Sequence, residues 1–359
     1  LSSARLAARY PSSGGTYVYG RERLGEFWGV LAGWGFVLGK TASCAAMALT
    51  VGSYAWPSQA HAVACAAVVA LTAVNYAGLQ KSAWLIRVLV ALVLAVLAAV
   101  VTAVLTSGEA RAGRLAIGSG TGSAGILEAA GLLFFAFAGY ARITTLGEEV
   151  RDPARVIPRA VQLALGIALA VYGAVALAVL SVLGPADLAG TTAPLTDAVR
   201  SAGVPALEPV VRVGAALAAL GALLALILGV SRTAMAMARD RHLPHVLAAV
   251  HPRFEVPHRA TLVIGVVVAV VAAAVDVRGA IGFSSFGVLA YYAIANASAW
   301  TLTPSEGRPH PVVPAVGLTG CLVLAFALPV SSVVSGGAVL AAVAAVHGLR
   351  RARGAARRR

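Results

Sequence analysis

Four charged residues that follow one apolar stretch have types and spacing that could do chemistry: Glu148, Glu149, Asp152 and Arg155. Paired carboxylates can act as a general acid and a general base. Here they follow a stretch long enough to cross a membrane, and several arginines lie beside them. Exposed ion pairs at such a boundary are weak and more often anchor or gate a helix. We therefore interpret the four residues as a gate network.

Two cations lie at depth in apolar stretches. Lys40 stands near the middle of Phe27–Gly52, and Arg142 stands within Gly125–Leu146. A charge at that depth is costly and usually faces a cavity. Lys40 could snorkel or bond to backbone carbonyls, or it could meet a substrate carboxylate or act as a protonatable switch. Arg142 cannot titrate usefully, so it is a candidate for an anchor or gate. We keep both as candidates for a coupling or substrate charge.

The histidines do not predict a metal site. His242, His245, His251 and His258 share one basic connection, and His-x-x-His spacing can bind a metal. No acid or cysteine completes a ligand set at suitable spacing. The sequence also lacks a His-Glu-x-x-His motif, a Gly-x-Ser-x-Gly motif and a P-loop. We therefore predict no metal, no cofactor and no enzymatic activity.

The stretch Phe134–Tyr140 reads Phe-Phe-Ala-Phe-Ala-Gly-Tyr inside an apolar run. Small residues there could interrupt a helix in mid-bilayer and free backbone groups that lipid cannot satisfy. Such a break must face protein, water or a ligand, and transporters use breaks of this kind to bind substrate near the midplane. The alternative is ordinary packing, because Gly and Ala let helices approach closely.

The elements that carry these residues are predicted to be membrane-spanning helices. Hydrophobic residues make up 59% of the 359 residues, charged residues 12%, and the mean hydropathy is +0.86, whereas soluble domains average about 25% charged residues. Apolar runs of about 20 residues can each cross a bilayer. About ten full spans are predicted: Phe27–Gly52, Gln59–Leu79, Trp84–Thr106, Gly125–Leu146, Pro158–Leu183, Leu207–Val230, Ala260–Val275, Ala280–Leu302, Pro311–Pro329 and Ser331–Gly348. The fold class is an all-α polytopic membrane protein.

The net charge of +14 is distributed as in a membrane protein and does not indicate nucleic-acid binding, because the arginines lie between spans and at the C-terminus. Alternate connections are rich in arginine, and the richer side is predicted to be cytoplasmic. We divide the chain into a membrane domain (1–348) and a basic cytoplasmic tail (349–359). The richer side holds Arg9, Arg21, Arg23, Lys81, Arg151, Arg155, Arg159, Arg232, Arg239, Arg241, Arg253, Arg259, Arg308 and the tail; the poorer side holds Arg111, Arg114, Arg200, Arg212 and Arg278.

Four motifs in order resemble those of the amino acid–polyamine–organocation superfamily of permeases. Ala7–Tyr19 resembles the loop after family helix 2, and Gly33–Trp34 resembles a pair in helix 3. Phe134–Ala160 resembles helix 6 with its exit, and Gly229–Asp240 resembles the end of helix 8. The resemblance covers nearly the whole chain.

The resemblance implies a leucine-transporter-type inverted-repeat fold with helices 1 and 6 broken. On this mapping the first full span is family helix 3, so helix 1 and most of helix 2 are lacking. Leu1–Ala8 reads as a helix 2 stub, and we infer that the N-terminus is truncated. The substrate would lie between the two breaks, and Gly139 would take dihedrals closed to other residues. The residues carried over as substrate-binding are Phe135, Ala136, Phe137, Ala138, Gly139 and Tyr140.

Two departures from that family affect coupling. Many relatives carry an Asp where this chain has Ala141, and often a helix 5 lysine, thought to serve in proton coupling, where this chain has Val93. Losing both together is coherent, because either alone would be a buried unpaired ion. The departures argue against the usual lysine-based proton coupling.

The predicted function is secondary active transport of amino acids across the cytoplasmic membrane by alternating access. Lys40 and Arg142 lie at depth while no Asp or Glu falls near a span centre, so we expect neutral or acidic substrates. The predicted partners are an amino acid or amine substrate, a coupling ion (proton or sodium) and the lipid bilayer. The alternatives are a membrane-embedded lipid-modifying enzyme and a transporter of polyamines or cationic amino acids.

Overall fold

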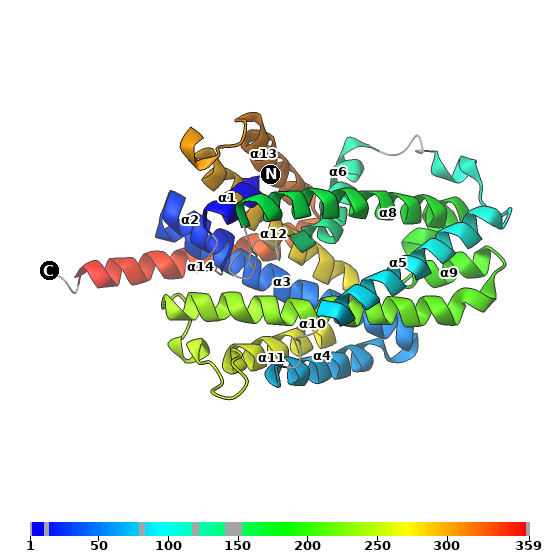
Figure 1. Ribbon diagram of the computed structural model, residues 1–359, viewed down its shortest axis with the longest axis horizontal. Helices are drawn as coiled ribbons and strands as arrows, with labels where there is room; N and C mark the ends of the chain where they lie inside the picture. The colour runs from blue at the N-terminus through cyan, green and yellow to red at the C-terminus, as the bar shows by residue number, and fades with distance from the viewer. Residues whose placement is uncertain (1, 11–13, 79–82, 117–121, 141–152, 357–359) are drawn as a thin grey trace.

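The structure is a computed structural model that describes residues 2–10, 14–78, 83–116, 122–140 and 153–356 (Figure 1). Every regular element in these ranges is a helix. The α-helices are α1 (Ser2–Arg9), α2 (Thr16–Leu24), α3 (Glu26–Ala55), α4 (Ala60–Tyr76), α5 (Ala83–Thr106), α6 (Ser123–Phe137), α8 (Pro153–Gly190), α9 (Pro194–Ser201), α10 (Glu208–Arg239), α11 (His258–Ala274), α12 (Val277–Trp300), α13 (Val312–Ala327) and α14 (Val330–Ala356).

Each of the ten predicted spans overlaps one helix, although residues 141–146 of the span predicted over Gly125–Leu146 lie outside the described residues. In the described part of the chain, seven helices are long and apolar enough to cross a membrane, judged by length and composition. The other three, α6, α11 and α13, are apolar but shorter, with 15, 17 and 16 residues. The tight hairpin expected between the last two spans is present, because only Leu328 and Pro329 separate α13 from α14. The prediction of an all-helical, polytopic membrane protein is therefore supported.

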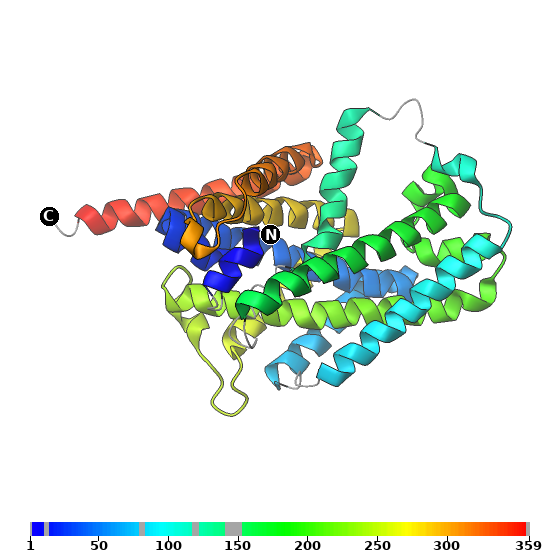
Figure 2. The same ribbon diagram turned by 45° about the horizontal axis from the view of Figure 1, so that its top comes forward.

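Some helices run past the ends that apolar length predicts. Helix α8 continues beyond Leu183 through a kink at Gly184, whose φ of 77° is left-handed and which precedes Pro185. Helix α14 continues past Gly348 into the basic tail and extends beyond the rest of the molecule (Figures 1 and 2). Arginine is a good helix former, so the loss of apolar character there does not end the helix.

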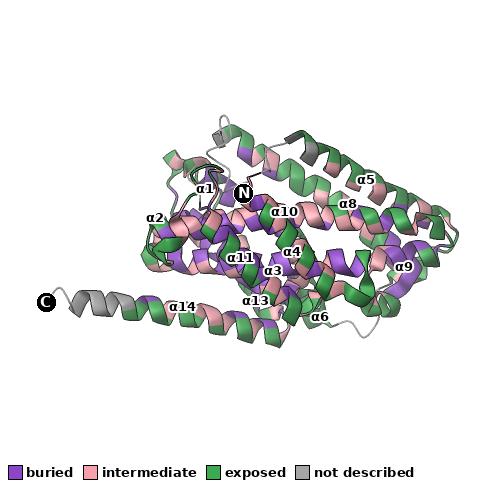
Figure 3. Cartoon of the chain, turned by 90° about the horizontal axis from the view of Figure 1, so that it is seen from below, coloured by how far each residue is buried: buried purple, intermediate pink, exposed green. Residues whose placement is uncertain are grey.

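Helix α3 forms the centre of the bundle. It packs extensively against α10 and α12 (Figure 1) and is buried along most of its length (Figure 3). The contact with α12 is backbone to backbone: a Cβ placed on Gly35 would lie 3.0 Å from the Gly287 carbonyl oxygen, and one on Gly39 would lie 3.1 Å from the Ser284 oxygen. Small residues four apart allow this approach. Helix α3 thereby brings Lys40 into the middle of the molecule.

The connections sort into two ends, and the arginine-rich ones gather at one of them. Arg21 of α2 pairs with Asp240 after α10 at 2.5 Å. Arg23 of α2 also pairs with Glu306, in the connection between α12 and α13. These pairs join connections that the charge pattern assigns to one side.

The opposite end is held by arginines that bond to helix-end carbonyls. Arg114 donates to the carbonyl of Val182, and Arg278 donates to the carbonyl of Ala189. Val182 lies just before the kink of α8 at Gly184, and Ala189 lies in the last turn of α8. The grouping of the connections agrees with the sequence pattern; which end faces the cytoplasm stays a prediction.

Candidate substrate site

Helix α6 ends inside the segment where the sequence predicted a break. The α-helix ends at Phe137 and is followed by a 3₁₀ turn over Ala138–Tyr140. The sequence predicted a distortion over Phe135–Gly139, so the change of helix type begins three residues later than expected. Tyr140 is the last residue before a part of the chain that the structure does not describe.

Three other helices supply hydrogen-bond donors to the carbonyls at this helix end. The last carbonyls of an α-helix have no partner within the helix. Tyr172 Oη on α8 donates to the Ala136 oxygen at 3.2 Å. The Ala138 oxygen accepts from Lys40 Nζ on α3 at 3.2 Å and from Tyr292 Oη on α12 at 3.4 Å. The end of α6 is therefore fixed by side chains from α3, α8 and α12.

Lys40 is the charged member of this group and is only 5% exposed. It does not snorkel, because its ammonium group is bonded at depth to a backbone carbonyl. Among the described residues it forms no ion pair. The carbonyl end of a helix carries a partial negative charge, so the end of α6 stabilises the ammonium group in place of an acid.

The six residues predicted to bind substrate differ in exposure. Ala138 is buried, Phe135 and Phe137 are half-buried, and Ala136 and Gly139 are exposed; the side chain of Tyr140 lies outside the described set. The prediction that Gly139 adopts dihedrals closed to other residues is wrong, because its φ is not positive. Among the described residues, a Cβ placed on Gly139 would meet nothing within 4 Å.

Aromatic rings surround the turn. The ring of Phe134 meets that of Tyr292 edge-on at 5.6 Å between centroids, and the ring of Phe137 meets that of Tyr172 at 5.2 Å. Tyr291 lies beside Tyr292 at 5.3 Å. Sequence reasoning missed these three tyrosines. For Tyr291 and Tyr292 a signal was present, because a phenol buried in an apolar span needs a hydrogen-bond partner.

The predicted gate and coupling residues are largely outside the described chain. Arg155 is exposed in the first turn of α8. Arg142, Glu148, Glu149 and Asp152 fall among the residues that the structure does not describe. Their roles stay predictions.

The described residues also lack a cluster that could hold a metal: no three His, Cys, Asp or Glu side chains there lie close enough together.

In the described part of the chain, the helical bundle places a buried cation beside the turn that ends α6. These are features of a membrane transporter, and comparison with known proteins agrees. The chain belongs to the amino acid permease family, which it matches over residues 1–346.

Its relatives include an uncharacterized transporter of Mycobacterium tuberculosis, which is 72% identical over 351 residues, covering 98% of this chain and 80% of that protein. The branched-chain amino acid permease BcaP of Bacillus subtilis is 25% identical, covering 90% of this chain and 76% of that protein. Human cationic amino acid transporter 4 is 27% identical, covering 86% of this chain and 52% of that protein.

Proposed function

We propose that this permease is a secondary active transporter of neutral or acidic amino acids in the cytoplasmic membrane. It works by alternating access on a leucine-transporter-type inverted-repeat fold, and its substrate binds beside the turn that ends α6. Residues 1–348 form the transport domain, and the basic tail 349–359 lies in the cytoplasm. The coupling ion is a proton or sodium.

One contact carries the proposal: the bond from Lys40 Nζ to the Ala138 oxygen. A substrate carboxylate is a stronger acceptor for an ammonium group than a neutral carbonyl. Because Tyr292 donates to the same oxygen, Lys40 can turn to a carboxylate without leaving that carbonyl unpaired. The exposed Ala136 and Gly139 leave room beside the turn.

The same lysine disfavours a cationic substrate side chain. Among the described residues no Asp or Glu forms an ion pair with Lys40. Repulsion between two cations in a poorly solvated site costs a few kcal/mol, which is on the order of a hundredfold in affinity.

The names of the relatives do not decide substrate charge, because one relative is named for branched-chain and another for cationic amino acids. The second name makes cationic amino acid transport the competing hypothesis. Membership of a permease family favours transport over the enzyme alternative. We propose that Arg142 anchors or gates the end of α6, and that Glu148, Glu149, Asp152 and Arg155 form the cytoplasmic gate.

Competition for uptake tests the substrate class. The transporter in proteoliposomes is given labelled leucine or glutamate with excess arginine, putrescine or unlabelled alanine. Arginine and putrescine should compete poorly. In Lys40→Met, arginine should compete better, whereas Tyr292→Phe, which also removes one donor to Ala138, should leave the charge preference unchanged. If arginine is the best competitor in the unmodified protein, the charge argument is wrong.

A further inference from the structure

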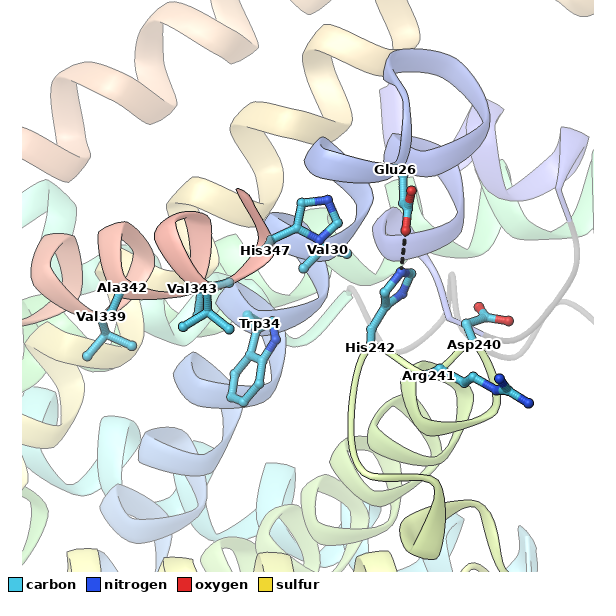
Figure 4. A pocket seen from close by; sticks show the side chains of 11 residues that line it. Glu26, Val30, Trp34, Asp240, Arg241, His242, Val339, Ala342, Val343 and His347 are labelled. Carbon is cyan, nitrogen blue, oxygen red and sulfur yellow. Dashed lines mark hydrogen bonds and ion pairs between the residues drawn. The ribbon is translucent and has the colours of Figure 1, made fainter. Parts of the chain in front are cut away.

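At the arginine-rich end, four side chains from α2, α3 and the segment after α10 form a hydrogen-bonded chain. Tyr17 Oη of α2 contacts Asp240 Oδ2 at 2.5 Å and His242 Nδ1 at 2.7 Å. His242 Nε2 contacts Glu26 Oε1, on the first residue of α3, at 3.0 Å (Figure 4). Asp240 also accepts from Arg21 of α2. The chain joins the corner between α2 and α3 to the segment that follows α10.

The backbone at the end of α10 places Asp240 and His242 in this chain. The N–H of His242 donates to the Met237 oxygen and that of Arg241 to the Ala238 oxygen, which is the Schellman pattern of helix termination. Its left-handed position is usually Gly, but here it is Arg241 with φ of 61°. A non-glycine residue in that conformation is uncommon. The helix therefore ends in a sharp turn that directs both side chains toward α2 and α3.

The three contacts along Glu26, His242, Tyr17 and Asp240 need three protons. Both carboxylates only accept when ionised, and a tyrosine has one proton to donate. A neutral histidine adds one more, which leaves one contact without a proton. An imidazolium adds two. Only the protonated His242 completes all three hydrogen bonds.

The tyrosine proton stays in place across the relevant pH range. Burial and, secondly, the hydrogen bond to Asp240 raise the pKa of Tyr17 well above its usual range, although Arg21 opposes the shift. Tyr17 therefore donates one proton throughout, and the number of protons in the chain changes at the histidine.

The charges around His242 come from four elements. Glu26 of α3 bonds to the ring directly, and Asp240 lies one hydrogen bond away through Tyr17. Arg21 of α2 pairs with Asp240, Arg241 is exposed beside the turn, and the ring of His347 on α14 lies 6.3 Å away. Of these charged groups, Glu26 is the one that is hydrogen-bonded to the ring of His242.

A pocket opens beside this hydrogen-bonded chain. It has a volume of about 540 Å³ between α3, α14 and the turn after α10. Glu26, Asp240, His242 and His347 line its polar end, and Trp34 and valines of α14 line the rest (Figure 4). The side chain of Glu26 is 48% exposed while that of His242 is 12% exposed. A proton can therefore reach the ring along Glu26.

We propose that His242, Tyr17, Glu26 and Asp240 form a proton-binding site, separate from the substrate site, that holds the α2–α3 corner against the end of α10. The proton binds on the imidazole and completes the hydrogen-bonded chain. Imidazoles change charge between about pH 5 and 8. The contact is therefore complete in mild acid and loses one hydrogen bond as pH rises. The site does not depend on which substrate is carried.

Thermal unfolding and histidine NMR of the purified protein test the proposal without a transport assay. Stability is compared at pH 5.5 and pH 8 for the unmodified chain, His242→Gln and Tyr17→Phe. The control is His245→Gln, which removes an exposed histidine from the same connection. The unmodified chain and the control should lose on the order of tenfold in the folding equilibrium between the two pH values. In His242→Gln and Tyr17→Phe, the folding equilibrium should fall by a smaller factor between pH 5.5 and pH 8.

The ¹⁵N shifts of His242, assigned by their absence in His242→Gln, report the proton directly. The site is supported if His242 is an imidazolium at pH 6 in the unmodified chain and if, in Tyr17→Phe or Glu26→Gln, it loses that proton at a lower pH than in the unmodified chain. A neutral ring at pH 6 in the unmodified chain overturns it. An equal loss of stability at both pH values in His242→Gln also overturns it, because a purely structural contact would behave in that way.

Discussion

Lys40 and Ala138 are joined across the centre of the bundle: the ammonium group of the one donates to the carbonyl oxygen of the other at 3.2 Å. The lysine belongs to a continuous helix, α3, and the carbonyl to the turn where α6 ceases to be α-helical. A buried cation thus rests on the negative end of a helix dipole. This contact links the proposed specificity for substrate charge to the geometry of the turn that ends α6.

Replacing Lys40 with Met should separate substrate binding from folding. The buried charge disappears together with one donor, and Tyr292 still bonds to the Ala138 oxygen, so stability should change by less than about 1 kcal/mol. Affinity for a carboxylate substrate should fall at least about tenfold. Ligand-induced shifts in thermal stability measure both effects. Tyr292→Phe is the matched control, and equal losses of affinity in the two variants would contradict the role of the charge.

Replacing Gly287 with Ala should destabilise the contact between α3 and α12. Its Cβ would lie 2.8 Å from the Gly35 oxygen, and forced overpacking typically costs about 1–3 kcal/mol. Gly229→Ala on α10 is the control, because its Cβ would meet no atom of the described residues within 4 Å and alanine favours a helix. Unfolding of both variants in detergent measures the difference. Equal stability of the two variants would show that α3 and α12 can move apart far enough to accept the added methyl group without a loss of stability.

The ion pair of Glu306 should survive mild acid. The hydrogen bond from Arg23 and then the backbone of Thr303 lower the pKa of Glu306 from 4.5 to about 2. Because the pKa is lower in the folded protein, the stabilisation is fully present above about pH 4.5 and is lost as pH falls toward 2. The difference in melting temperature between the unmodified chain and Glu306→Gln should therefore stay constant from pH 8 to pH 5.

Below pH 4.5 that difference in melting temperature should shrink. The control is Glu109→Gln, which removes an exposed carboxylate that forms no ion pair among the described residues. If the difference in melting temperature already disappears between pH 7 and pH 5, Glu306 takes up its proton at a higher pH than its lowered pKa predicts, and the prediction is wrong.

The arginine-rich end should face the cytoplasm. After Cys44, Cys65 and Cys321 are replaced, single cysteines at Ala248 or Gly354 should resist an impermeant thiol reagent added to intact cells. A cysteine at Glu109, at the opposite end, should react quickly. The reverse pattern would invert the topology.

The sequence alone determined the class of protein and its spans. Hydrophobic length is a local property, so each predicted span has its helix, and the family motifs lie within short segments. The end of α6 was nearly determined as well, because Ala138 and Gly139 follow its last α-helical residue, Phe137; whether this end is a break within a span stays a prediction. The lysine at depth was also visible as an exception to the apolar pattern.

Only the tertiary structure decided what these residues contact. Lys40 and Ala138 are 98 positions apart, and Tyr292 is 154 positions from Ala138; nothing in the local pattern pairs them. The same holds for the chain from Glu26 to Asp240, which depends on the left-handed turn at Arg241. Partners of this kind arise when helices pack, because a hydrogen bond to a side chain requires proximity in space, and span length and composition do not encode that proximity.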